Sequence, residues 1–157
     1  MAYAWASESP NYPDFTSWVA SMMGVPADDM PGSDTLAMAY DTSLNIALPD
    51  LGSIPYQAGT PSLYALAVYN LGGAILVDIA QDDPDSTYWS NLRSKFNTSS
   101  YAWGITSSAS DQGTSTGMTM PGFIQNMMPM DLWLACTPWG RVYMTIAGAW
   151  SAVWGIS

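Results

Sequence analysis

Four aspartates between residues 78 and 85 form the densest group of potential metal ligands in the sequence. Asp78, Asp82, Asp83 and Asp85 could bind Ca²⁺, because hard cations take several carboxylate oxygens. The segment lacks the glycine and the terminal glutamate of an EF-hand loop. Two interpretations follow, a cation-binding loop and a solvated helix end. The second fits the pattern better, so we expect no metal site.

Other residue types that carry out catalysis are scarce. The chain has no histidine, the side chain most often used as a general base. Its single cysteine, Cys136, has no neighbouring base that would turn the thiol into a nucleophile, and we expect it to be a small buried residue. No glycine-rich loop is followed by a lysine, so nucleotide binding has no support. We predict a non-enzymatic protein without catalytic residues or cofactors, with a small metal-dependent enzyme as the alternative.

The charge of the chain argues against binding to nucleic acid. Thirteen acidic residues face only three basic ones, Arg93, Lys95 and Arg141, for a formal net charge of −10. Binding to DNA is driven by Lys and Arg, which displace counterions from phosphates. We therefore predict no binding of nucleic acid, sequence-specific or otherwise.

The most apolar stretch runs from Leu63 to Ala80. Asn70 and Asp78 interrupt it and no basic residues flank it, so we expect a helix buried nearly all round and no membrane partner. The chain begins without a positive charge before an apolar stretch, which indicates synthesis in the cytoplasm without a secretory signal.

Aromatic and sulfur-containing side chains are abundant. The chain is 48% hydrophobic and only 10% charged, and it contains eight Trp, nine Tyr and eleven Met. These residue types are enriched where proteins meet proteins. An aromatic-rich core and a partner-facing surface both remain open as explanations.

Apolar periodicity at three-to-four spacing predicts a series of helices. Each has start or stop signals, such as Ser33 as an N-cap, Pro49 as a stop, and Thr137 as the N-cap before Pro138. The predicted helices span Asp14 to Met23, Thr35 to Leu48, Ser62 to Ala80, Tyr88 to Phe96, and a final segment from Pro138.

Helical periodicity stops between Ile105 and Met120, where Ser, Thr and Gly dominate around Asp111-Gln112-Gly113. This pattern predicts a β-hairpin. The fold class is therefore mainly α, a small helical bundle with an inserted β-hairpin and extended terminal arms. We expect a single domain over residues 1–157, made of an N-terminal arm (1–13), a helical body (14–104), the hairpin (105–120), closing helices (121–149) and a C-terminal tail (150–157).

Several short motifs are similar to one known family. Pro13-Asp14-Phe15 opens the first helix and Gly24-Val25-Pro26 closes it. Ile105 to Thr116 is a Ser/Gly-rich hairpin, and Thr137-Pro138-Trp139-Gly140-Arg141-Val142-Tyr143 starts the last helix. With the order of elements, these motifs resemble the head-completion or head-to-tail adaptor (connector) proteins of tailed phages. The likeness extends from Pro13 to Ile146.

The resemblance implies a virion structural protein, made in the host cytoplasm, that forms a homo-oligomeric ring between the portal protein and a tail or nozzle protein. Rings of this family have roughly twelve copies. Another phage structural subunit, of the tail or an accessory of the capsid, is the alternative. The side chains expected to meet partners are Tyr3, Trp5, Tyr12, Ile105, Met118, Trp139, Arg141, Trp150, Trp154 and Ile156.

Overall fold

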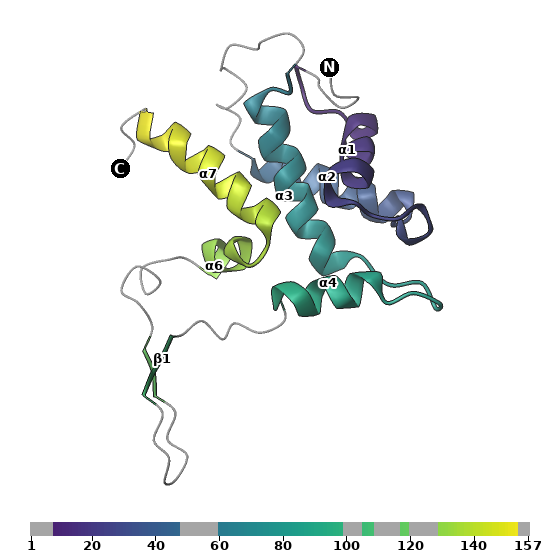
Figure 1. The fold of residues 1–157 in the computed structure, drawn as a ribbon. Helices are drawn as coiled ribbons and strands as arrows, with labels where there is room; N and C mark the ends of the chain where they lie inside the picture. Colours follow the sequence, from purple (N-terminus) through teal and green to yellow (C-terminus); the bar gives the residue numbers. More distant parts are fainter. Residues whose placement is uncertain (1–7, 48–59, 99–104, 109–116, 120–128, 154–157) are drawn as a thin grey trace.

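A computed structural model of the chain describes residues 8–47, 60–98, 105–108, 117–119 and 129–153. These residues are mainly helical, which confirms that part of the predicted fold class. Figure 1 shows α3 in the middle, α1 and α2 on one side of it, α7 on the other, and α4 across one end. Side chains from all five of these helices join one hydrophobic core around α3.

The central helix, α3 (Leu63–Ile79), is the apolar helix that the sequence predicts. It begins after Ser62, whose hydroxyl accepts a hydrogen bond from the N–H of Ala65 at 3.0 Å. Most of its side chains are buried, as expected. Buried Asn70 satisfies its amide by donating to the Leu66 carbonyl at 2.8 Å. In the part of the chain that the structure describes, no helix is both long and apolar enough to cross a membrane.

The first helix, α1 (Tyr12–Trp18), continues into a π-helical turn, η1 (Val19–Met23), and ends at Gly24 with a φ of 69°. The predicted glycine stop is confirmed. The helix begins at Tyr12, two residues before its predicted start at Asp14, because the Asn11 side chain accepts a hydrogen bond from the N–H of Asp14 at 2.9 Å and so caps the helix there.

The next helix, α2 (Ser33–Ile46), follows a short 3₁₀ turn, η2 (Ala27–Asp29). The predicted N-cap at Ser33 is wrong, because Gly32 occupies the cap position and Ser33 is already helical. Among the described residues, no side chain caps this helix. The predicted continuation to Leu48 ends at Ile46 instead, with Ala47 in an extended conformation.

Helix α4 (Tyr88–Phe96) matches its predicted span and ends at Asn97, which has a left-handed φ of 53°. Its Trp89 is buried, and the indole N–H donates to the carbonyl of Asp29 at 2.9 Å. This bond ties α4 to the turn before α2, so α4 closes one end of the core.

Two consecutive helices complete the body, α6 (Pro129–Cys136) and α7 (Pro138–Val153). The predicted cap at Thr137 is confirmed, since its hydroxyl accepts a hydrogen bond from the N–H of Gly140 at 3.0 Å. Helix α7 packs along α3 and against α6. It extends through Val153, past the expected start of the C-terminal tail at residue 150.

Two short strands, β1 (Ile105–Ser108) and β2 (Gly117–Thr119), pair antiparallel with Ile105 opposite Thr119. Residues 109–116, where the turn is expected, lie outside the described residues. The inserted hairpin over Ile105 to Met120 therefore stays a prediction.

Candidate partner-docking groove

The aspartates around residue 82 have structural partners. Asp82 accepts hydrogen bonds from the N–H groups of Trp89 at 2.5 Å and Ser90 at 3.0 Å, so it caps α4. Asp78 accepts a hydrogen bond from the indole N–H of Trp133. Among the residues described, no three carboxylate or thiol side chains gather closely enough to hold a metal ion.

The pKa of Asp82 lies below its ordinary value. Loss of water around the carboxylate raises this pKa, but hydrogen bonds from the Ser90 side chain and from the N–H groups of Trp89 and Ser90, with the charge of Arg93, lower it by more. The carboxylate therefore stays ionised well into the acidic range, which suits its capping role.

Each of the three basic side chains makes a contact within the chain. Arg93 lies 3.7 Å from Asp82 and donates to the carbonyl of Ala80 at 2.6 Å, at the end of α3. Arg141 donates to the carbonyl of Ala135 at 2.8 Å, in the last turn of α6. Lys95 lies over the ring of Phe96. Both arginines thus cap the carboxyl ends of helices, where a positive charge is favourable.

Of the predicted partner-facing residues, three have described side chains, and each has contacts within the chain. The Tyr12 hydroxyl donates to the Ser33 carbonyl at 3.1 Å. Trp139 packs edge-on against Phe96, with ring centroids 5.6 Å apart. Trp139 and Arg141 share the first turn of α7, whereas Tyr12 belongs to α1 on the other side of α3 (Figure 1). Their roles toward partners stay predictions.

The other seven predicted partner-facing residues cannot be placed as side chains. Tyr3, Trp5, Trp154 and Ile156 lie outside the described residues. Ile105 and Met118 lie in β1 and β2, and Trp150 lies in α7, but only their backbone is described.

Cys136 is buried, as the sequence predicts. Burial and then the nearby charge of Asp78 raise the pKa of its thiol, and the opposing effect of Arg141 is smaller. Its thiol is therefore protonated at neutral pH, which agrees with a packing role.

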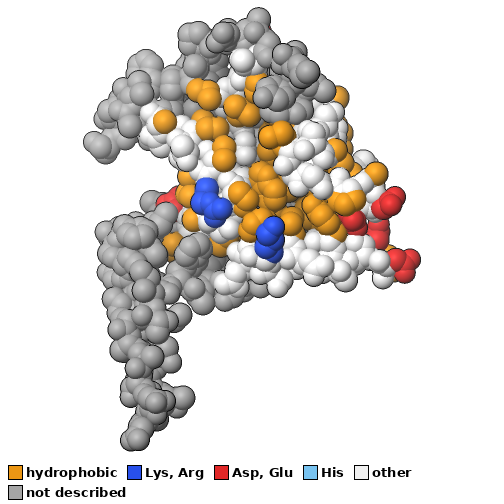
Figure 2. Space-filling model, viewed as in Figure 1, with side chains coloured by type: hydrophobic (Ala, Val, Ile, Leu, Met, Phe, Trp, Pro, Cys, Tyr) orange, Lys and Arg blue, Asp and Glu red, His pale blue; other side chains and the backbone are white. Residues whose placement is uncertain are grey.

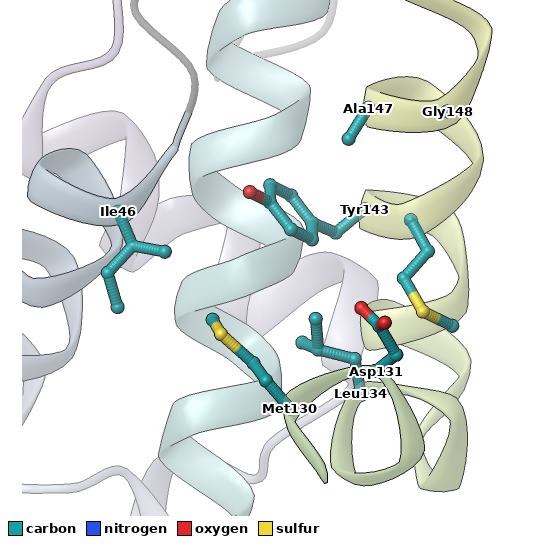
Figure 3. A pocket seen from close by; sticks show the side chains of 8 residues that line it. Ile46, Met130, Asp131, Leu134, Tyr143, Ala147 and Gly148 are labelled. Atoms are coloured by element: carbon teal, nitrogen blue, oxygen red, sulfur yellow. The ribbon is translucent and has the colours of Figure 1, made fainter. Parts of the chain in front are cut away.

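A groove of about 480 Å³ lies between the end of α2 and the corner formed by α6 and α7. Its walls are mostly apolar, and two of the side chains at its edge, Ile46 and Met130, are more than 40% exposed. Figure 3 shows Ile46 on one side, Met130 and Leu134 rising from α6, and Tyr143 reaching from α7 toward the end of α2. The lining residues are Ile46, Met130, Asp131, Leu134, Tyr143, Met144, Ala147 and Gly148.

Tyr143 brings a polar atom into this apolar groove. The residue is only 7% exposed, and burial raises the pKa of its hydroxyl, which is therefore neutral at neutral pH. Within the described part of the chain, no hydrogen-bond partner of this hydroxyl is found. By contrast, the buried Tyr69 hydroxyl bonds to both backbone polar groups of Asn11, accepting at 3.2 Å and donating at 3.4 Å.

Exposed apolar surface extends beyond the groove. Figure 2 shows hydrophobic side chains across the middle of one face, over α3 and beside α7, with acidic side chains at the edge near the α3–α4 loop. Leu63 on α3 and Val142 on α7 are each more than 40% exposed. Exposed apolar patches on a folded body mark sites of interaction.

Most of the groove could not be predicted from the sequence, because its walls come from three helices that meet only in the folded chain. One signal was available. Ile46 falls off the apolar stripe of its helix, which runs through Leu36, Tyr40 and Leu44, and a large aliphatic side chain on the polar face of a helix indicates a second apolar contact. The sequence around Met130 and Asp131 gives no comparable signal.

The chain was also compared with known proteins. No protein-family model, no curated protein and no solved structure matches it.

Proposed function

We propose that this chain is a structural subunit of a tailed-phage virion, a head-to-tail adaptor that forms a ring between the portal and the tail. The observation that carries the proposal is the open apolar groove on a small, well-packed helical body. Such a groove suits a subunit that binds other proteins rather than one that converts a substrate.

The motifs that resemble the adaptor family support the same proposal. The Thr137 to Tyr143 motif forms the corner between α6 and α7, in which Thr137 caps α7 and Arg141 caps α6. Tyr143, at the end of this motif, lines the groove. The motif thus has a structural task and also borders the proposed docking surface.

In this proposal, the hairpin between Ile105 and Met120 and the two arms contact neighbouring subunits, the portal or the tail. The net charge of −10 suits a ring through which DNA passes, since an acidic wall does not retain a polyanion. The protein has no catalytic function.

A native mass spectrum, combined with metal analysis of the same sample, tests this proposal. We expect a closed oligomer of one size, alone or on addition of the portal protein, and no bound metal. A strictly monomeric protein that copurifies with a stoichiometric divalent metal would contradict the proposal and favour a metal-dependent enzyme. A virion component that attaches without forming a ring would favour a tail or capsid accessory subunit.

A further inference from the structure

We infer that the groove between α2, α6 and α7 binds a bulky apolar side chain, preferably an indole, from a partner protein that carries a basic group beside it. The inference rests on the proposed function, because it names the chemistry of the partner that an assembly subunit would hold. The partner in this inference is a different protein and not a second copy of this chain.

The size and the walls of the groove fit such an anchor. A volume of about 480 Å³ lies within the range of roughly 300–1,000 Å³ that binding pockets occupy. Leu134 forms the floor and is 2% exposed, whereas Ile46 and Met130 at the edge are exposed. Met130 and Met144 are flexible and polarizable, so they can adapt to a flat aromatic ring.

The hydroxyl of Tyr143 indicates that the occupant also has a polar atom. A buried hydroxyl costs stability unless it forms a hydrogen bond, and among the described residues this one has no partner. A tyrosine hydroxyl both donates and accepts. An indole N–H is a donor on an otherwise apolar ring, so it matches an apolar groove that contains one hydroxyl.

The charges favour a basic partner. Asp131 carries the only charge among the eight described residues that line the groove, and the whole chain has a net charge of −10. A second copy would bring the same net charge of −10, and two such chains repel each other. Charge complementarity therefore favours a different protein that supplies a Lys or Arg.

The test uses two small probes that share an indole and differ in charge, tryptamine (a cation) and indole-3-propionate (an anion). Each is added to the full chain with ¹³C-labelled methionine methyl groups. We expect tryptamine to shift the NMR signals of Met130 and Met144. The signals of Met22 and Met38, which are exposed outside the groove, should not change. Indole-3-propionate should bind at least about threefold more weakly than tryptamine, because the acidic groove repels its negative charge.

Matched variants then locate the binding. Ala147→Trp fills the groove and should abolish the shifts, whereas Ala149→Trp, at an exposed position on the same helix outside the groove, should retain them. Asp131→Asn should remove the preference for tryptamine over indole-3-propionate. Asp34→Asn is the control, because it also removes an acidic residue from the first turn of a helix, and the preference should remain. Thermal unfolding checks that each variant is folded.

Four results would overturn the inference. One is equal shifts at all four methionines, which would mean unspecific binding. Another is binding that Ala147→Trp does not affect in a folded protein. The third is an oligomer of the chain alone that Ala147→Trp dissociates and Ala149→Trp does not, because the groove would then hold a second copy. Absence of tryptamine binding in a protein that still forms its ring would refute this inference and leave the adaptor proposal intact.

Discussion

Gly140 lies so close to Leu134 that a β-carbon at residue 140 would be only 2.1 Å from the Leu134 carbonyl oxygen. This contact is between backbone atoms across the α6–α7 corner, so no side-chain rotation can relieve it. We expect Gly140→Ala to lower the free energy of unfolding by about 3 kcal/mol, measured by urea denaturation.

Gly148 provides the control for this change, because it lies in the same helix and a β-carbon there would have none of the described atoms within 4 Å. Gly148→Ala should raise stability by up to about 1 kcal/mol through helix propensity. Equal effects of the two substitutions would contradict the close packing of the corner.

The two buried tyrosines that differ in hydrogen bonding give a second prediction. Tyr69→Phe removes two bonds to the backbone of Asn11 and should lower the free energy of unfolding by about 1 kcal/mol. Tyr143→Phe removes a hydroxyl without a described protein partner and should leave stability unchanged or raise it by less than about 1 kcal/mol. A large loss of stability in Tyr143→Phe would show that its hydroxyl has a structural bond, against the docking role.

The glycine pair in α3 gives a third prediction. A β-carbon at Gly73 would lie 2.9 Å from the outer ring atoms of Trp18 and 3.2 Å from the sulfur of Met23. Gly73→Ala should destabilise the protein by about 1–3 kcal/mol. The Trp18→Phe substitution removes those ring atoms. In that background, Gly73→Ala should destabilise the protein by at least about 0.5 kcal/mol less. A double-mutant cycle from denaturant unfolding measures this coupling, and additive effects would argue against the contact.

Acid unfolding supplies a fourth prediction, based on Asp82. Its pKa is lower in the folded chain than its ordinary value of 3.8, so the ionised carboxylate stabilises the fold above that value. This stabilisation disappears as the pH falls through the lower folded pKa. We expect Asp82→Asn to be less stable than the wild type at neutral pH and the difference to shrink steadily below about pH 4.

Asp85→Asn is the control, because it removes an exposed carboxylate from the same loop. Its stability should follow that of the wild type at every pH. A constant difference between the wild type and Asp82→Asn from neutral to acidic pH would show that the carboxylate does not cap α4 in its charged form.

Local signals in the sequence predicted most of the helices. Thr137 caps α7 and Gly24 ends η1 as expected, and α3 begins next to its predicted start at Ser62, because caps and stops depend on neighbouring residues. The N-cap of α2 was predicted one residue late, since Ser33 is a good cap by type but Gly32 takes the cap position. Local sequence does not distinguish between two adjacent N-cap positions of this kind.

The groove and the roles of the charged residues depend on distant contacts. The sequence predicted no structural role for Arg93 and only a partner contact for Arg141, whereas both cap helices that precede them in the chain. Asp78 was grouped with Asp82, but each accepts a hydrogen bond from a different tryptophan, at residues 133 and 89. Periodicity describes one helix at a time, so it cannot show which helices meet.

Electron microscopy of phage particles tests the proposed adaptor role of this chain most directly. The chain would carry a small fused tag, and averaged images of intact particles would be compared with and without the tag. We predict a ring of tag density between the portal and the tail, and an annular particle for the purified assembly. Tag density along the tail tube or over the capsid faces, or no tag density on the particle, would contradict the account.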